Sequence, residues 1–347
     1  MEFIYDYGLF LAKTITFVLA FAGIVAIIAA SAMKQAQKRG ELEVTDISEQ
    51  LKEVEEEVTH HLLSKEALKE KEKQNKKNAK LKAKEAKKSQ SDSEEPTKPR
   101  LFVIDFKGSI DAKEVSALRE EITAVLMVAT ERDEVLVTLE SGGGMAHCYG
   151  LAASQLARIK QANIPLTISV DKVAASGGYM MACVADKIVS APFAILGSIG
   201  VIAQIPNFNK VLKKNDVDFE QLTAGEYKRT LTMFGENTDK GREKFKEELE
   251  EMHELFKEHI TEHRPTLDVE SVATGETWLG KKAITVNLID ELITSDDYIY
   301  QANQNRKVIG IKYAVKKGLA EKLSKAASLS IDNAISKLWQ HNRIFPS

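Results

Sequence analysis

Ser176 stands between two alanines and two glycines, in the segment DKVAASGGYM (171–180). SGGYMMACVA (176–185) reads as a helix that is apolar on every face and therefore buried. The serine then lies where a strand becomes a helix. A small hydroxyl in that place has two interpretations: it caps a buried helix, or it is a nucleophile held on a tight turn.

A second glycine turn, SGGG at 141–144, follows an earlier apolar run. In parallel α/β sheets the carboxyl ends of neighbouring strands lie side by side, and ligands bind there. Backbone N–H groups of such turns point at whatever lies above them, and an oxyanion needs two donors. Gly143 or Gly144 can supply one, and Gly177 the other. The two turns together predict an acyl-transfer site.

A serine nucleophile needs a base, and the sequence offers two candidates. His147 is the nearest histidine in sequence, but it falls on the helix after the first turn, with no carboxylate placed to orient it. Lys228, in GEYKR (225–229), precedes apolar residues, and burial would favour its neutral form, as in known Ser-Lys sites. On these residues alone Lys228 is one lysine among many, and a surface position is the plainer interpretation.

Strands and helices alternate through the middle of the chain. The predicted strands are 101–106, 135–139, 166–170 and 187–191. The predicted helices run from Val115 to Leu126, over 150–163, over 176–185 and over about 239–263, before a closing αβ unit at 273–292. This alternation predicts a parallel sheet with right-handed crossovers, and the unbroken apolar strands predict cover on both faces.

The first third of the chain has a different composition. Thr14 to Met33 carries no formal charge and, as a helix, would span roughly 30 Å, the hydrocarbon thickness of a bilayer. The run is longer than a signal-peptide core and is preceded by Glu2 and Asp6, so we expect one uncleaved transmembrane anchor. Under the positive-inside rule, the lysines after the span favour an orientation in which most of the chain lies on the cytoplasmic side.

Residues 34–99 are expected to form a charged spacer that is partly helical or disordered. The spacer is acidic over 41–57 and rich in lysine over 65–88, with apolar residues at helical spacing near Val54 and Val58. We expect it to be solvated; contact of the lysine block with anionic lipid is the alternative. The chain ends in a basic tail, 311–347.

The overall composition excludes several classes of function. The net charge of −3 argues against nucleic acid as a partner. Cys148 and Cys183 lie in apolar surroundings without metal-ligand spacing, so neither a disulfide framework nor a redox role is expected. HITEH (259–263) fits an inverted zinc-protease motif, but Pro265 ends that helix and no obvious third ligand follows, so no metal is expected.

Five long motifs resemble one known family. They are DFKGSIDA (105–112), LESGGGM (139–145), DKVAASGGYMMACVADKIVSAPFAILGSIGV (171–201), AGEYKRTL (224–231) and the closing WLGKKAI…LIDEL unit. Over nearly its whole length the chain resembles the signal-peptide-peptidase (SppA-like) family of membrane-anchored serine proteases, and within it the SohB-type branch. The resemblance implies a crotonase/Clp-protease-like α/β core of repeated ββα units, here 100–310, preceded by the anchor (1–33) and the spacer (34–99).

The same resemblance assigns roles to five residues. It implies a Ser-Lys dyad with Ser176 as nucleophile and Lys228 as general base. It places the oxyanion donors on Gly143 and Gly177, and Ser198 in GSIGV is a candidate for orienting the lysine. It further implies no metal or organic cofactor, and oligomers that enclose their sites in a dome. The family is found in the bacterial inner membrane, and the side that the catalytic domain faces is left open.

Two positions depart from the family pattern. The family turn usually reads S-P-G-G, and Gly142 takes the place of the proline, which should loosen the turn. Asn287 stands where the closing unit often has glycine, and asparagine is the next best residue for a left-handed helix cap. Neither change removes a reacting group.

The expected function is therefore endopeptidase cleavage of apolar peptides in or near the membrane, such as remnant signal peptides or misfolded membrane and envelope proteins. Two alternatives are a crotonase-type enzyme acting on acyl-coenzyme A and a non-catalytic membrane scaffold with a protease fold. The anchor and the serine at the oxyanion position argue against the first, and the presence of both Ser176 and Lys228 argues against the second.

Overall fold

The computed structural model describes residues 7–24 apart from 12 and 22, residues 40–64, the single positions 66, 67, 70, 73 and 77, and residues 98–314. The chain forms two compact units, Met1–Leu42 with Tyr313–Ser347, and Glu43–Lys312. Each is described here by itself.

The described residues between 7 and 24 are helical. Across the described part of the chain, no helix has both the length and the apolar character that a membrane crossing requires. The anchor predicted from Thr14 to Met33 is described only in part, since residues 25–33 lie outside the described residues. Most of the lysine block at 65–88 and the tail from residue 315 also lie outside them.

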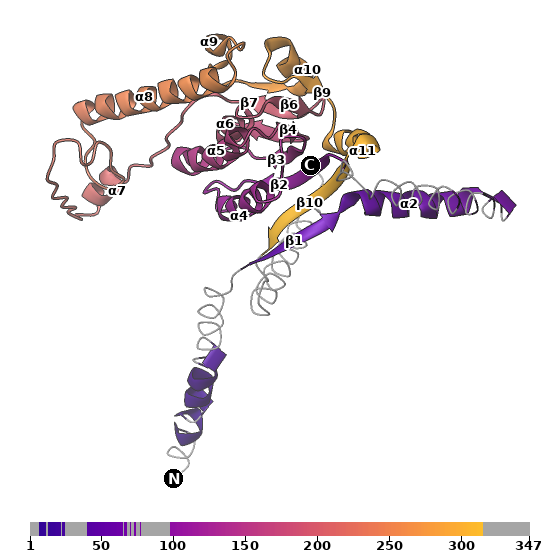
Figure 1. The fold of residues 1–347 in the computed structure, drawn as a ribbon. Coiled ribbons are helices and arrows are strands. Elements are labelled where there is room, and N and C mark those ends of the chain that lie inside the picture. Colours follow the sequence, from indigo (N-terminus) through magenta and orange to yellow (C-terminus); the bar gives the residue numbers. More distant parts are fainter. Residues whose placement is uncertain are drawn as a thin grey trace, which may run out of the picture. The chain divides into compact units, whose positions relative to one another are not determined.

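The main sheet has the strand order β1-β10-β2-β3-β4-β6-β9 (Figure 1). All strand pairs from β10 to β9 are parallel, as predicted. β3 and β4 are buried on both faces, which explains their unbroken apolar sequences. The strand bounds are β1 Glu41–Asp46, β2 Arg100–Lys107, β3 Glu134–Glu140, β4 Leu166–Val170, β6 Lys187–Ser190, β9 Glu291–Leu292 and β10 Lys307–Ala314.

A second, smaller sheet leads directly into the serine turn. It consists of β5 (Val173–Ala175), β7 (Ile195–Gly197) and β8 (Thr277–Leu279), with β5 parallel to β7 and β7 antiparallel to β8. The strand before Ser176 is thus β5 of this sheet, which the sequence analysis did not predict. The chain leaves the main sheet at Asp171, whose carboxylate accepts a hydrogen bond from the Ser295 N–H at 2.9 Å.

Several helices bury apolar side chains in the core. α5 starts at Ala146, earlier than the predicted residue 150, and α6 ends at Ala182, before the predicted residue 185. The long α8 has the predicted bounds and buries only Phe256 and Ile260. The helix bounds are α2 Ile47–Leu62, α4 Val115–Leu126, α5 Ala146–Gln161, α6 Gly177–Ala182, α7 Asn209–Lys214, α8 Asp239–His263, α9 Val269–Val272, α10 Gly280–Ala283, the 3-10 helix η1 Ile284–Val286 and α11 Ser295–Asn305.

The predicted charged spacer contributes two ordered elements. β1 takes the edge of the main sheet, and α2 follows it with the Asp46 side chain accepting a hydrogen bond from the Glu49 N–H at 3.0 Å. Ser48 in the first turn of α2 bonds to Asn303 and to the Val308 N–H. No residue of α2 is buried. The prediction of partial helix is confirmed, whereas β1 was not predicted, because its exposed Glu-Leu-Glu-Val alternation resembles a solvated segment.

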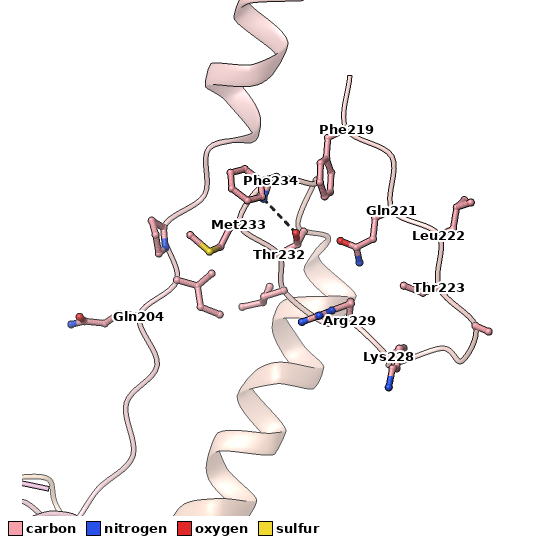
Figure 2. Close-up of a pocket in the computed structure, with 14 residues that line it drawn as sticks. Gln204, Phe219, Gln221, Leu222, Thr223, Lys228, Arg229, Thr232, Met233 and Phe234 are labelled. Carbon is pink, nitrogen blue, oxygen red and sulfur yellow. Dashed lines mark hydrogen bonds between the residues drawn. The ribbon is translucent and has the colours of Figure 1, made fainter. Parts of the chain in front are cut away.

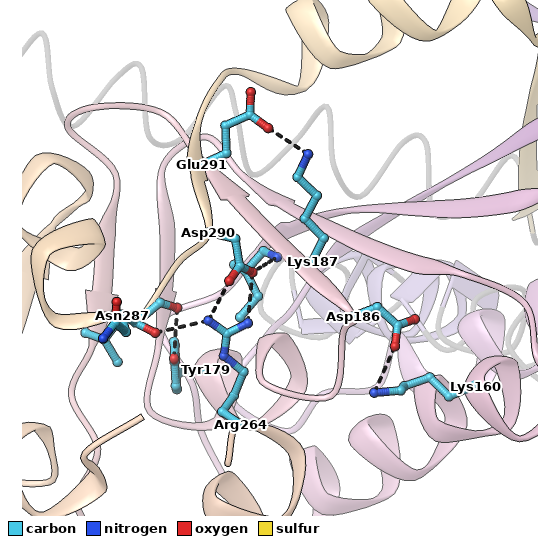
Figure 3. A network of polar contacts seen from close by, with 10 residues as sticks. Lys160, Tyr179, Asp186, Lys187, Arg264, Asn287, Asp290 and Glu291 are labelled. Atoms are coloured by element: carbon cyan, nitrogen blue, oxygen red, sulfur yellow. Dashed lines mark hydrogen bonds and ion pairs between the residues drawn. The ribbon is translucent and has the colours of Figure 1, made fainter. Parts of the chain in front are cut away.

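A polar network fixes the closing αβ unit behind α6 (Figure 3). The Arg264 guanidinium donates to both carboxylate oxygens of Asp290, at 2.8 and 2.9 Å, and to the Asn287 carbonyl at 3.0 Å. Burial alone would raise the pKa of Asp290, but the Arg264 hydrogen bonds, the Ile188 N–H and the positive charges of Arg264 and Lys187 together hold that pKa below its usual value. Asn287 has φ +59° and ψ +22°, which confirms the left-handed cap expected at this position.

Candidate active site

The two glycine turns meet at one place. Gly143 has φ +86°, and a side-chain carbon added there would lie 2.7 Å from the Gly177 nitrogen and 2.8 Å from Ser176 Cβ. Only glycine allows this backbone conformation and this close approach together. The segment after β3 is joined to β5 by Ser141, whose N–H donates to the Val173 carbonyl at 2.9 Å. The juxtaposition predicted from sequence is confirmed.

Ser176 is held in a conformation that serine rarely adopts. Its backbone has φ +51° and ψ −119°, and its N–H donates to the Gly197 carbonyl at 2.8 Å. The side chain is half-buried and makes no capping hydrogen bond to α6. Within the described residues the Ser176 hydroxyl has no hydrogen-bond partner. The first interpretation of this serine, a helix cap, is therefore not supported, and a strained, unbonded hydroxyl fits the second.

The backbone donors beside Ser176 differ in what they bond. The Gly177 N–H has no acceptor among the described residues. The Gly143 N–H donates to Ser141 Oγ at 3.1 Å. The first turn therefore lies in contact with the serine, but one of its N–H groups is occupied in this state.

Ser198 lies next to the serine turn. Ala175 pairs with Gly197 in the register of β5 and β7, so Ser176 and Ser198 follow paired residues. Ser198 also has a positive φ, +51°, and its N–H donates to the Glu276 carbonyl at 2.6 Å. Its half-buried hydroxyl bonds no described residue. Ser198 is thus placed where it can contact a group that approaches Ser176.

Lys228 lies on a different part of the molecule. It belongs to residues 201–238, here called the arm, which extends away from the sheets and joins the start of α8 (Figure 1). Lys228 is exposed and lines an open pocket of about 900 Å³ within the arm, together with Phe219, Leu222 and Phe234 (Figure 2). No residue of the serine turn lines this pocket. Within the described residues, the structure brings no atom of Lys228 into hydrogen-bonding contact with Ser176.

The turn that carries Lys228 is anchored to α8 by its other residues. Gly225 has φ +99°, and its carbonyl accepts the Lys228 N–H at 3.2 Å. Glu226 pairs with Lys240 at 2.5 Å, and the Lys240 ammonium also lies 5.7 Å from the centre of the Tyr227 ring. These contacts fix the backbone of the turn, and Lys228 lies at the edge of the residues that line the arm pocket (Figure 2).

The histidines considered from sequence make no hydrogen bond to Ser176 within the described residues. His147 is exposed on the first turn of α5 and bonds no described residue through its side chain. The His259 and His263 rings are 4.7 Å apart, and His259 Nε2 lies 3.0 Å from the Met180 carbonyl oxygen. Among residues that the structure describes, no cluster of three metal-ligating side chains includes them.

Two residues beneath the turns were missed from sequence. Tyr149, fully buried on α5, has its hydroxyl 2.5 Å from Ser141 Oγ and donates to the Ser109 carbonyl at 2.8 Å. Burial raises the pKa of Tyr149, so the phenol stays protonated. Tyr149 reads as one more apolar position on the buried face of a helix, and Ser141 as an ordinary turn residue. No sequence signal separated them from their neighbours.

A strained serine directly before an unbonded backbone N–H, on a parallel α/β core, fits an acyl-transfer hydrolase. Two family descriptions match the chain: "Peptidase family S49 N-terminal" over residues 2–156 and "Peptidase family S49" over residues 158–309. The chain belongs to peptidase family S49, in its SohB-type branch, and is a peptidase consistent with serine-type chemistry.

Relatives with this assignment are similar over almost the whole chain. "Probable protease SohB" of Haemophilus influenzae is 51% identical over 334 residues, covering 95% of each chain. The protein of the same name from Buchnera aphidicola subsp. Schizaphis graminum is 47% identical over 348 residues, 99% of this chain and 100% of its own. Among solved structures, a membrane-bound stomatin-specific protease with a substrate peptide is 14% identical, with a TM-score of 0.41, over 66% of this chain and 98% of its own.

Proposed function

We propose that the protein is a membrane-anchored serine endopeptidase in which Ser176 is the nucleophile and Lys228 the general base. The observation that carries the proposal is the Ser176 turn: a non-glycine residue at φ +51° with an unbonded hydroxyl, directly before the free Gly177 N–H. Such strain is kept where the surroundings impose it, and it leaves the hydroxyl available for attack.

The reaction follows from these groups. A neutral Lys228 amine takes the proton of the Ser176 hydroxyl as Oγ attacks the scissile carbonyl carbon. The tetrahedral oxyanion accepts hydrogen bonds from the Gly177 N–H and from the Gly143 N–H, which must first leave Ser141 Oγ. The C–N bond then breaks, the Lys228 ammonium returns its proton to the leaving amine, and an acyl-enzyme remains. Water hydrolyses this ester with Lys228 again as base, and Ser198 orients the amine.

The separation of Lys228 from Ser176 shapes the proposal. A base must come within about 3 Å of the proton that it removes. The arm exposes several large apolar side chains, including Ile202, Leu222 and Phe234. Monomeric soluble proteins rarely expose a large apolar patch of this kind. We infer that assembly of several copies buries this surface and brings the arm of one copy to the serine turn of another.

The proposed substrates are apolar peptides in or near the membrane, such as remnant signal peptides or misfolded membrane and envelope proteins. The uncharged run Thr14–Met33 supports a membrane location. A crotonase-type reaction on acyl-coenzyme A would not need the Ser176 hydroxyl, and the assay below separates that alternative.

The test uses the full chain in detergent with a quenched apolar peptide. Ser176→Ala and Lys228→Ala should each lower kcat/KM by at least about a thousandfold, because both act in proton transfer and attack. Chelator should have no effect. An equimolar mixture of the two variants, exchanged through denaturant, should recover part of the activity if arm and serine come from different copies. Wild-type activity in either single variant would refute the dyad.

A further inference from the structure

The two proposed oxyanion donors differ in their availability. The Gly177 N–H has no acceptor among the described residues. The Gly143 N–H donates to Ser141 Oγ at 3.1 Å, in a bond between two neutral groups of the same turn. An N–H group carries one proton, so an oxyanion at this turn receives it only when the bond to Ser141 breaks. One donor is therefore free, and the other is held by a neighbouring side chain.

The acceptor, Ser141 Oγ, is fixed in position. The Ser141 N–H donates to the Val173 carbonyl at 2.9 Å, and the Ser141 carbonyl accepts the Ala175 N–H at 3.0 Å. The residue is only 2% exposed. Tyr149 Oη donates to the Ser109 carbonyl, so the Ser141 hydroxyl is the donor across the 2.5 Å between Ser141 Oγ and Tyr149 Oη. Because backbone and side chain are both bonded, Ser141 Oγ does not swing away from the turn.

The donor, the peptide between Gly142 and Gly143, is free to rotate. At the place where a side chain of Gly142 would stand, nothing lies within 4 Å, and Gly143 has φ +86°. Glycine passes between backbone conformations at little cost, so no side chain hinders the rotation. A proline at position 142 would fix one of the neighbouring angles, and Gly142 leaves it free. The turn thus combines a fixed acceptor with a mobile donor.

We propose that Ser141 is a competing acceptor that restrains the peptidase: its hydroxyl holds the Gly143 N–H in a less active conformation. This rests on the proposed function, since it concerns a donor of the same site. A neutral substrate carbonyl gains little by displacing the Ser141 hydroxyl. A charged oxyanion forms a hydrogen bond about twice as strong and takes the N–H as attack proceeds. Breaking the bond to Ser141 is therefore part of the activation barrier and lowers kcat.

The test removes the competing acceptor in the full chain, in detergent, with a quenched apolar peptide. Ser141→Ala should raise kcat about three- to tenfold, as expected for one neutral hydrogen bond, and change KM less than about twofold. Ser141→Cys, whose sulfur accepts weakly, should give a smaller rise. Ser190→Ala is the matched control: Ser190 is also buried, and its hydroxyl donates to the Ala191 carbonyl at 2.9 Å. Its kcat should stay within about 1.5-fold of wild type.

A peptide aldehyde gives a second readout that does not depend on turnover. Ser176 Oγ bonds to the aldehyde carbon, Lys228 takes the hydroxyl proton, and the aldehyde oxygen becomes an oxyanion. Ser141→Ala should bind this aldehyde about three- to tenfold more tightly than wild type. The corresponding peptide alcohol has no carbonyl, so both proteins should bind it equally. A merely structural role of Ser141 would weaken the binding of both ligands or of neither.

Two outcomes overturn the proposal: a lower or unchanged kcat in both Ser141→Ala and Ser141→Cys, or an unchanged ratio of aldehyde to alcohol affinity. Thermal unfolding of each variant confirms that it is folded. Ser176→Ala is measured in parallel. If Ser176→Ala is inactive while Ser141→Ala matches wild type, the competing role is wrong and the nucleophile stands. If Ser176→Ala keeps its activity, the proposed function itself is wrong.

Discussion

The serine turn and the arm are built in opposite ways. At the serine turn, glycines approach neighbouring backbone and side chains so closely that an added carbon would lie within 3 Å of other atoms at Gly143 and Gly177. In the arm, residues 201–238, no residue is buried, and Leu222 is 94% exposed. Packing within one chain therefore fixes the nucleophile's surroundings, whereas the chain alone does not fix the position of the proposed base. In the proposed site, one half is therefore intrinsic to the chain, and the other half would depend on a further contact.

The largest effect expected from this contrast is on the first glycine turn. Gly143→Ala places a carbon 2.7 Å from the Gly177 nitrogen at φ +86°, so the turns must separate and kcat should fall at least about a hundredfold. Gly142→Ala is the matched control, because the added carbon meets nothing within 4 Å. It should stay within about twofold of wild type, or gain a little stability from a stiffer unfolded chain.

Steady-state kinetics and thermal unfolding of both variants test whether the close contact between the two glycine turns is needed for catalysis. Equal activity of Gly143→Ala and Gly142→Ala would mean that the contact between the turns does not matter for catalysis, and the site would have to be sought elsewhere.

A second prediction tests the arm. Leu222→Asp puts a charge on its most exposed large apolar side chain and should reduce assembly and lower kcat/KM at least about tenfold, while the unfolding midpoint of the core is unchanged. Met127→Asp is the control on the core surface, where the methionine is 79% exposed. Sedimentation velocity in detergent, together with the peptide assay, measures both. Full assembly and activity in Leu222→Asp would remove the arm from the proposed interface.

The same contrast explains what sequence could and could not predict. The parallel strands, the bounds of α8 and the left-handed cap at Asn287 depend on local pattern, and all were predicted. The meeting of the two glycine turns followed from a general property of parallel sheets. β5 was missed because a three-residue strand after Asp171 has no periodicity to detect.

The positions of Tyr149 and Lys228 illustrate two further limits. Tyr149 bonds to residues 40 and 8 positions before it in the chain, and no local sequence pattern reports such contacts. Lys228 was assigned from a motif, and a motif carries no information on which chain or which arrangement brings the residue to its partner. Sequence therefore predicts the elements well, the backbone turns fairly well, and the side-chain partners poorly.

The smallest expected effect is on stability at acid pH. It compares a buried carboxylate of the core with an exposed carboxylate of the arm. Asp133 is buried at the edge of the core, where its carboxylate pairs with Arg100 at 2.7 Å and accepts the Thr130 N–H at 2.8 Å. Burial alone would raise the pKa of Asp133, but the Arg100 and Thr130 hydrogen bonds lower it to about 2, from an ordinary value of 3.8. The arm offers a contrast in Glu236, whose pairing with Lys213 at 2.9 Å is exposed to solvent.

Because the folded pKa of Asp133 is depressed, its contribution to stability is fully present above pH 3.8 and is lost as the pH falls toward 2. The loss should be roughly 2 kcal/mol in the free energy of unfolding. Urea unfolding between pH 5 and pH 2 should show this slope in wild type and in Glu236→Gln, and a flatter profile in Asp133→Asn. Parallel profiles for wild type and Asp133→Asn would show that the Arg100 pair does not couple protonation to folding.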